Sequence, residues 1–333
     1  MDVRLAVLGA GRIGRQHALA IAQTEGARLV AVSDPMSEAV EAVTSRFGGQ
    51  SAEIDAIAAD PDVDGVLICT PTDTHADLIE RFAHVGKAIF CEKPVDLSVQ
   101  RVRQCLTVVD ETDAKLMVGF NRRFDPSFAA AHAAVRAGEV GEVELVQITS
   151  SDPGAPPIPY IKSSGGIFRD MTIHDLDMAR FLMGEEPVTV YATGSVLTDP
   201  AIGEAGDYDT CTVTLTTASG KHCVITNSRR TTYGYDQRAE VHGSKGMVAV
   251  ENPTPKTVAS AGAGGFTRPP LHDFFMTRYL EAYAAEIAAF VGVIRDDTDP
   301  DPTGEDGLRS LILADAATQS ARERRVITLE AAE

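Results

Sequence analysis

Three groups of residues in this 333-residue chain have types and spacings that could perform chemistry. The first is a glycine-rich loop made of Gly9, Gly11, Arg12, Ile13 and Gly14. An apolar run precedes this loop and a segment of helical period follows it. Between a strand and a helix, such glycines allow a tight turn, a close approach of backbone to pyrophosphate, and close helix–strand packing. The helix N-terminus then directs free N–H groups at the phosphates, so the loop predicts dinucleotide binding.

Asp34 follows Gly14 by 20 residues and ends the next apolar run. A carboxylate at this point can accept hydrogen bonds from the ribose hydroxyls of adenosine, and it would repel a 2′-phosphate. No Arg or Lys occurs among the three residues after it. We therefore expect NAD rather than NADP as the cofactor. The alternative is that Asp34 only begins a turn before Pro35.

The second group lies at the ends of two later apolar runs. It consists of Thr70, Pro71 and His75 after the first run, and of Glu92, Lys93 and Pro94 after the second. Parallel sheets bind ligands at the carboxyl ends of their strands. We expect Thr70, Pro71, His75, Glu92 and Lys93 to contact the cofactor. On position alone, Lys93 could equally form an ordinary surface ion pair.

The third group is the segment 165–184, which has apolar residues at helical spacing and ends at Gly184. Asp170 and His174 are four residues apart, so they share one face if the helix includes both. Alternatively, Thr172 is the N-cap, Asp175 completes a capping box, and Asp170 precedes the helix. A His beside a carboxylate can act as an acid or base near neutral pH, but it can also be a partly buried structural pair.

No metal site is expected. The histidines at 75, 84, 132 and 222 and Cys91 do not combine into ligand spacing, and the helix with His174 lacks a second His. Hydride transfer from a carbinol to nicotinamide needs no metal if a side chain removes the proton.

The elements that position these groups follow two patterns. Up to about residue 120, short β-branched runs alternate with helical segments, which is typical of an α/β fold with a doubly wound parallel sheet. The expected strands are 4–8, 29–33, 65–69, 88–91 and 115–118, and the expected helices are 13–23, 37–46, 75–84 and 98–111 with Ser98 as N-cap.

After Pro126, one helix, 127–137, precedes strands joined without helices, which predicts an α+β domain on a large, mostly antiparallel open sheet. The expected strands are 143–150, 188–197, 210–217, 223–229, 239–242 and 247–251, and the late helices are 274–295 and 307–323. Residues 259–265 are expected to be a flexible loop. The predicted division is a Rossmann domain, 1–122, and a substrate-binding and oligomerisation domain, 123–333.

Composition excludes several classes of protein. The formal charge is −18, so nucleic acid and anionic membranes are poor partners. No apolar stretch approaches the roughly 18–20 residues of a membrane span, and the first residues lack the pattern of a signal peptide. The five cysteines are unpaired in spacing and mostly lie in apolar runs. We expect a cytoplasmic protein with reduced core cysteines.

Four segments together resemble the Gfo/Idh/MocA oxidoreductase family, and this resemblance covers nearly the whole chain. They are residues 9–14, 92–94, 119–125 and 165–184. The last two are more specific to the members that oxidise inositols. The resemblance implies an N-terminal Rossmann domain, a C-terminal domain with a large open sheet, and a homotetramer packed through those sheets. It also implies NAD-dependent oxidation of a cyclic polyol, first myo-inositol, to the ketone.

The resemblance also implies roles for individual residues. It makes His174 the general base, Asp170 its orienting partner, and Lys93 a donor to the reacting oxygen. A neutral polyol requires many donors and acceptors around it. The expected substrate contacts are Lys93, Asn121, Arg122, Asp152, Tyr160, Asp170, Thr172, His174 and Tyr235. The alternatives are a scyllo-inositol or pyranose dehydrogenase of the same family, or a non-catalytic NAD-sensing regulator.

Overall fold

The computed structural model describes residues 2–329. They form two compact units, each built from two stretches of chain. The first unit contains the residues up to Asp125 together with Leu280–Leu311. The second contains Pro126–Tyr279 together with the residues from Ile312 onward. Each unit has its own large sheet.

The first unit is built on a parallel six-stranded sheet with the order β3-β2-β1-β4-β5-β6. The strands are β1 (Val3–Leu8), β2 (Ala27–Ser33), β3 (Gln50–Ser51), β4 (Gly65–Ile68), β5 (Ala88–Glu92) and β6 (Leu116–Gly119). Starting at the central strand β1, the chain first adds β2 and β3 on one side of it. It then returns to the centre and adds β4, β5 and β6 on the other side. A topological switch point therefore lies between β1 and β4, where such sheets bind ligands. The predicted doubly wound fold is confirmed.

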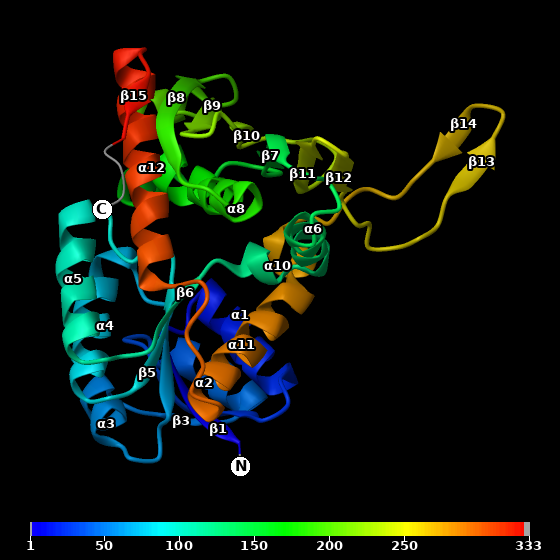
Figure 1. The fold of residues 1–333 in the computed structure, drawn as a ribbon. Helices are drawn as coiled ribbons and strands as arrows, with labels where there is room; N and C mark the ends of the chain where they lie inside the picture. The colour runs from blue at the N-terminus through cyan, green and yellow to red at the C-terminus, as the bar shows by residue number, and fades with distance from the viewer. Residues whose placement is uncertain (1, 330–333) are drawn as a thin grey trace. The chain divides into compact units, whose positions relative to one another are not determined.

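Helices cover both faces of this sheet, so its central strands are mostly apolar; all of β4 is buried, whereas the edge strand β3 is polar and exposed. In Figure 1, α4 and α5 lie on one face and α1 and α2 on the other. The helices are α1 (Arg12–Gln23), α2 (Ser37–Phe47), α3 (Ile54–Ala59), α4 (His75–His84) and α5 (Val99–Glu111), with 3-10 turns η1 (Thr72–Thr74) and η2 (Asn121–Phe124). Ser98 is the N-cap of α5, as predicted, because its hydroxyl accepts from the backbone N–H of Arg101 at 3.3 Å.

Helix α11 (Leu280–Arg295) also belongs to the first unit. It packs along α1, where the Tyr283 ring meets His17, and the Phe290 ring meets Phe90 of β5 at 5.8 Å. The predicted division at residue 122, with 123–333 as one domain, is therefore corrected. The apolar face of α11 could be buried in either core, and no local signal in the sequence says which.

The second unit is built on a seven-stranded sheet with the order β12-β11-β7-β10-β9-β8-β15. The strands are β7 (Val143–Ser151), β8 (Pro187–Ser195), β9 (Thr210–Thr217), β10 (His222–Ser228), β11 (Asp236–Gly243), β12 (Gly246–Val250) and β15 (Ile327–Thr328). All neighbours are antiparallel except β7 and β10, which are parallel. The predicted large, mostly antiparallel sheet is confirmed.

One face of this sheet carries the core of the second unit. Val146, Val213 and Ile225 point from it toward Leu176 and Leu182 of α8. The opposite face is half-buried to exposed and rich in threonine, at positions 149, 212, 214, 216 and 226. The helices are α6 (Pro126–Arg136), α7 (Ile158–Ser163), η3 (Phe168–Thr172), α8 (Ile173–Met183), α9 (Pro200–Glu204), α10 (Phe275–Arg278) and α12 (Gly304–Glu323), the last of which begins in the first unit.

The glycine-rich stretch that was expected to be a loop forms a hairpin. Its strands are β13 (Ser260–Gly262) and β14 (Gly265–Thr267), which pair antiparallel across a two-residue turn. Figure 1 shows the hairpin extending away from β11 and β12. All five cysteines are buried and unpaired. Within residues 2–329, no helix has the length and apolar character needed to cross a membrane.

Candidate active site

The glycine loop joins β1 to α1 at the switch point of the first sheet. Gly9 has φ +92°, and a β-carbon on it would lie 2.6 Å from the Cys69 carbonyl oxygen at the end of β4. A β-carbon on Gly14 would lie 1.8 Å from the carbonyl oxygen of Gly9. Gly11, in contrast, has no heavy atom of the described chain within 4 Å of its β-carbon position. Two glycines thus allow close packing, and the third leaves open space before α1, where a pyrophosphate would approach.

Asp34 is one residue past β2 and connects that strand to the glycine loop. Its Oδ2 accepts from the backbone N–H of Ala10 at 2.7 Å, and its Oδ1 accepts from the N–H of Met36 at 2.8 Å. Each carboxylate oxygen can accept a further hydrogen bond. The turn role is therefore observed, and the ribose role remains compatible with it.

His75 connects the carboxyl ends of β4 and β5. Its Nδ1 lies 2.9 Å from the Pro94 carbonyl oxygen and its Nε2 lies 2.8 Å from that of Thr70. Because both nitrogens face backbone carbonyls, any contact of His75 with a cofactor would use the carbon edge of its ring. The buried thiol of Cys69 beside this loop has its pKa raised by desolvation, so it stays protonated.

Glu92, the last residue of β5, is directed at α1. Its Oε1 lies 2.7 Å from Nε2 of His17, which is fully buried. The carboxylate of Glu92 therefore links β5 to α1 through His17. Its contact with the cofactor remains a prediction. Lys93 follows it, half-buried, and is joined to Pro94 by a cis peptide bond. Asn121 and Arg122, both buried, follow the neighbouring strand β6 and so share this sheet edge.

Asp170 and His174 lie on a continuous helical segment of the second unit. Asp170 is in η3, a turn of π-helix, and His174 is in the first turn of α8, which follows directly. The backbone N–H of Asp170 donates to the Gly166 carbonyl at 3.0 Å. Single turns of π-helix occur frequently at functional sites. One of the two alternatives from the sequence placed Asp170 in the same helix as His174. Neither alternative predicted that this turn is a π-helix.

Two side chains lie beside Asp170: Arg229, which no prediction from the sequence included, and Tyr160, which was expected to contact the substrate. Arg229 is only 1% exposed, and its guanidinium nitrogens lie 3.5 Å from Oδ2 of Asp170 and 3.5 Å from Oδ2 of Asp207. The Tyr160 hydroxyl donates to Oδ1 of Asp170 at 2.9 Å. The carboxylate of Asp170 is therefore held from two sides. The one available signal was the pair Arg229-Arg230, directly after a strand.

A buried polar network attaches the start of α8 to the sheet, and it corrects the role expected of Thr172. The hydroxyl of Thr172 donates to Oδ1 of Asn227 at 2.7 Å, and Nδ2 of Asn227 donates to Oδ2 of Asp175 at 2.8 Å. Ser150 donates to the other oxygen of Asp175. Thr172 is fully buried, so it positions α8 and does not offer its hydroxyl to a substrate. The capping-box alternative is also wrong, because Thr172 makes no side-chain cap.

The other expected substrate contacts of the second unit differ in accessibility. Tyr160 is 45% exposed and Asp152 is half-buried. Tyr235 is buried, with its ring edge-on to those of Phe274 and Tyr279 at 6.0 Å, which favours a packing role. In the part of the chain that the structure describes, no three His, Cys, Asp or Glu side chains are grouped to hold a metal ion.

Comparison with known proteins identifies both halves of the chain. Residues 3–120 match the oxidoreductase family with an NAD-binding Rossmann fold, and residues 128–249 match the Gfo/Idh/MocA C-terminal domain. The chain belongs to the Gfo/Idh/MocA family. The resemblance found in the sequence and the expected cofactor NAD are thereby confirmed.

Members of the family with inositol activities are similar to this chain over their whole length. Inositol 2-dehydrogenase of Rhizobium meliloti is 63% identical, covering 99% of this chain and 100% of that protein. The structure of a myo-inositol dehydrogenase from Corynebacterium glutamicum is 45% identical with a TM-score of 0.96, covering 100% of both chains. The scyllo-inositol dehydrogenase of Lactobacillus casei, with bound NAD(H) and scyllo-inositol, is 28% identical with a TM-score of 0.92, covering 98% and 99%.

The residues present fit NAD. The open space at Gly11, the N-terminus of α1 and the carboxylate of Asp34 suit a pyrophosphate and a ribose diol. When bound, the nicotinamide of NAD supplies the hydride acceptor for oxidation of an alcohol.

Proposed function

We propose that this enzyme oxidises the C2 hydroxyl of myo-inositol to the ketone, with transfer of a hydride to NAD. The observation that carries the proposal is the placement of Asp170 in the π-helical turn and of His174 in the helix that follows directly, in a chain 63% identical to an inositol 2-dehydrogenase. A histidine can accept a proton near neutral pH, which oxidation of a secondary hydroxyl requires.

In the proposed mechanism, His174 accepts the hydroxyl proton as the hydride leaves. Asp170 orients the imidazole and accepts a hydrogen bond from a neighbouring substrate hydroxyl. Arg229 and Tyr160 restrain Asp170, because they contact its two carboxylate oxygens. Lys93 donates to the reacting oxygen and stabilises negative charge that develops there. Positioned proton transfer of this kind contributes about 10²- to 10⁴-fold to the rate.

Asn121, Arg122, Asp152 and Tyr160 are proposed to bind the remaining hydroxyls of the ring. They offer both donors and acceptors, as a neutral polyol requires. A stereoisomer with one inverted hydroxyl would leave a polar side chain of the site without its hydrogen-bond partner. Because an unpaired buried polar group is costly, the enzyme should bind that stereoisomer more weakly.

A second candidate substrate is scyllo-inositol. It is favoured by the similarity to the Lactobacillus casei enzyme, which has scyllo-inositol bound. The two substrates differ in the orientation of one hydroxyl, and the same proton acceptor and cofactor would serve both.

We also infer that the enzyme is a cytoplasmic homotetramer. The half-exposed, threonine-rich face of the second sheet supports assembly, because β-branched residues on the face of a sheet pack well against a second sheet. Five unpaired thiols in the core suit a reducing compartment.

The test is the initial rate of NADH formation at mildly alkaline pH. Purified enzyme is assayed with myo-inositol, scyllo-inositol, D-chiro-inositol and D-glucose, each with NAD and with NADP. We expect the highest kcat/KM for myo-inositol with NAD. A higher value for scyllo-inositol or glucose would move the substrate to that alternative, and a higher value with NADP would refute the role of Asp34. Binding of NAD without turnover of any polyol would favour the regulator alternative.

A further inference from the structure

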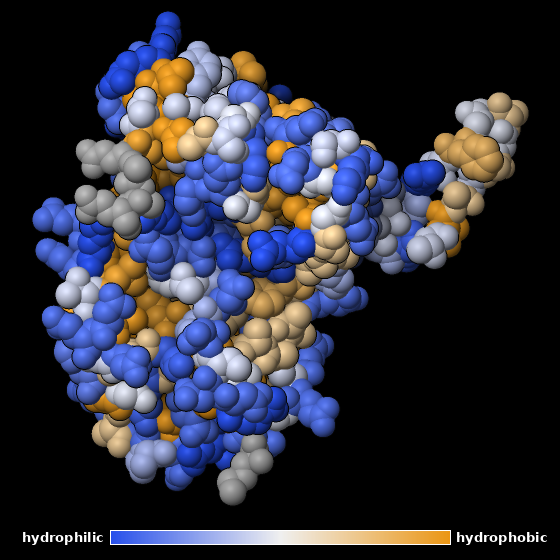
Figure 2. Space-filling view, in the orientation of Figure 1, coloured by the Kyte–Doolittle hydropathy of each residue, from blue (hydrophilic) through white to orange (hydrophobic). Residues whose placement is uncertain are grey.

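The hairpin of β13 and β14 belongs to a longer projecting segment, which we call the arm and define as residues 253–270. Every residue of both strands is exposed. Phe266 is 84% exposed and Val258 is 63% exposed. Figure 2 shows pale to orange colours over most of the arm, in contrast to the blue that covers much of the remaining surface on this side. An isolated two-stranded hairpin is marginally stable in water, so a projecting one with exposed apolar side chains suggests a binding surface.

The root of the arm is fixed at both of its ends. On the entry side, Oδ1 of Asn252 accepts from the backbone N–H of Gln237 at 2.8 Å, and Nδ2 of Asn252 donates to Oδ1 of Asp236. On the exit side, the N–H of Leu271 donates to the Tyr233 carbonyl at 3.2 Å.

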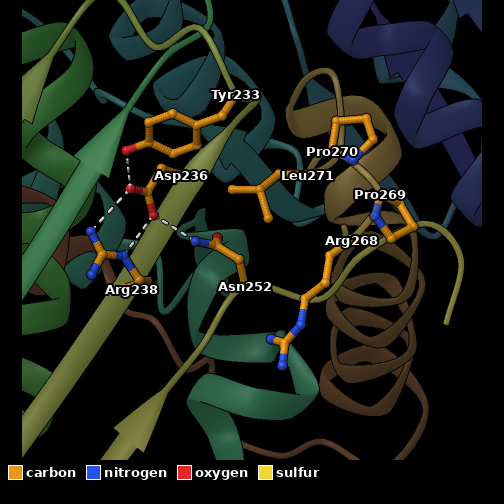
Figure 3. Close-up of a pocket in the computed structure, with 8 residues that line it drawn as sticks. All are labelled: Tyr233, Asp236, Arg238, Asn252, Arg268, Pro269, Pro270 and Leu271. Atoms are coloured by element: carbon orange, nitrogen blue, oxygen red, sulfur yellow. Dashed lines mark hydrogen bonds and ion pairs between the residues drawn. The ribbon is translucent and has the colours of Figure 1, made fainter. Parts of the chain in front are cut away.

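Asp236 is the centre of this root. It is buried, and it also accepts from the Tyr233 hydroxyl and from Nε of Arg238, each at 2.8 Å (Figure 3). These residues line a pocket of about 410 Å³ together with Arg268 of the arm. A fixed root sets the direction of the arm before any partner binds, which lowers the entropy cost of association.

The charge of the arm is opposite to that of the rest of the chain. Residues 252–271 contain no Asp or Glu, and their charged residues are Lys256 and Arg268, whereas the whole chain has a formal charge of −18. Neither Lys256 nor Arg268 forms an ion pair within residues 2–329, and both are exposed. Two cations are too few to attract a polyanion against the field of the whole molecule. They complement an acidic protein surface of moderate size.

We propose that the arm binds the acidic surface of a second copy of this chain, with Lys256 and Arg268 facing carboxylates and Phe266 covered by the partner copy. The second copy supplies the two features that the arm lacks, which are negative charge and a surface to cover its apolar residues. This inference concerns assembly and does not depend on the proposed substrate, because its tests do not measure dehydrogenase activity.

The first test places a photo-crosslinker on the arm. Because the native cysteines are all buried, the variant Phe266→Cys can be labelled selectively with benzophenone maleimide. Illumination should give a covalent dimer of twice the 35.4 kDa chain mass, with the linked peptides located by mass spectrometry. The control is Val85→Cys in the first unit, which replaces another exposed apolar residue (48% exposed). Adducts within one chain only, or equal dimer yields from both sites, would overturn the proposal.

The second test changes charge. Lys256→Glu with Arg268→Glu takes the formal charge from −18 to −22, since each reversal shifts it by two. Arg28→Glu with Arg103→Glu makes the same change at exposed positions outside the arm. Sedimentation equilibrium should show an association constant at least about tenfold lower for the arm variant and unchanged for the control. Equal weakening of both, no effect of the arm variant, or a monomeric wild type would refute the proposal.

Discussion

Glu286, on α11, is an unusual residue of the first unit because its carboxyl group is fully buried among packed helices and strands. Neither of its oxygens has a hydrogen-bond partner in residues 2–329. Desolvation raises its pKa well above the usual value, and the charge of Glu92 raises it further. Folding therefore requires Glu286 to keep a proton that the unfolded chain releases above about pH 4.3.

The direction of the resulting pH dependence follows from this raised pKa. The stability of the folded state should fall as pH rises from the unfolded-state pKa toward the folded-state pKa. Glu286→Gln removes this titration and keeps the shape of the protonated acid, so we expect it to stabilise the protein at pH 8 by about 1–3 kcal/mol and to have little effect at pH 4.5.

Urea unfolding at several pH values measures this difference. Glu38→Gln on α2, where the side chain is exposed, serves as the control and should leave the free energy of unfolding unchanged at every pH. A Glu286→Gln variant whose stability parallels that of the wild type between pH 4.5 and 8 would show that Glu286 is not held protonated.

His174 and Lys93 are the residues whose removal should affect chemistry most directly. We expect His174→Ala or Lys93→Ala to lower kcat by about 10²- to 10⁴-fold, because each removes a group proposed to act on the reacting oxygen. The Kd of NAD, measured by fluorescence titration, should change by less than about threefold. His84→Ala, at an exposed position on α4, is the matched control. Turnover at the wild-type rate in either variant would remove that residue from the mechanism.

The glycine loop permits a prediction at the level of an element. Gly11→Ala introduces a methyl group into open space, so the protein should keep its Tm but bind NAD about tenfold or more weakly. Gly14→Ala introduces one 1.8 Å from the Gly9 carbonyl oxygen, so the loop and α1 must separate, and both Tm and NAD affinity should fall. Thermal unfolding and NAD titration distinguish the two, and equal losses of Tm in both variants would contradict the role of Gly11.

The sequence predicted the elements whose evidence is local. Most strands of both sheets and helices such as α4 and α5 could be recognised because their apolar periodicity, flanking glycines or, for α5, the Ser98 cap lie within or next to each segment. Short elements such as β3, α3 and β15 have too few residues to show a period. The parallel pairing of β7 with β10 depends on contacts between distant segments, which no local pattern contains.

The same limit applies to the candidate site. The residues that could be proposed from the sequence stand in compact motifs, as Asp170 and His174 do. Arg229 reaches Asp170 from the residue after β10, and Asp207, in the loop before β9, contacts Arg229. Glu286 approaches Glu92 from a helix almost 200 residues later. Thr172 was misassigned because its motif suggested substrate, whereas its actual partner Asn227 belongs to a distant strand.

At the scale of the whole molecule, the first unit depends on its second stretch of chain. A fragment ending at Asp125 lacks α11, so apolar residues of α1 and β5 that α11 covers would be exposed to water. We expect that fragment to be insoluble or to unfold without a cooperative transition. The same fragment joined to residues 280–311 by a Gly/Ser linker should melt cooperatively in circular dichroism. Equal cooperative melting of both would show that α11 is dispensable.

This arrangement also affects how the chain is made. Leu280 follows Asp125 by 155 residues, and ribosomes add about 5–20 residues per second, so α11 emerges about 8–30 s after the sheet it covers. During that interval the part of the nascent Rossmann sheet that α11 will cover is exposed, while β7 to β12 of the second sheet are being translated. A chaperone that binds apolar surface on nascent chains would therefore bind the exposed face of the first unit mainly before residue 280 leaves the exit tunnel.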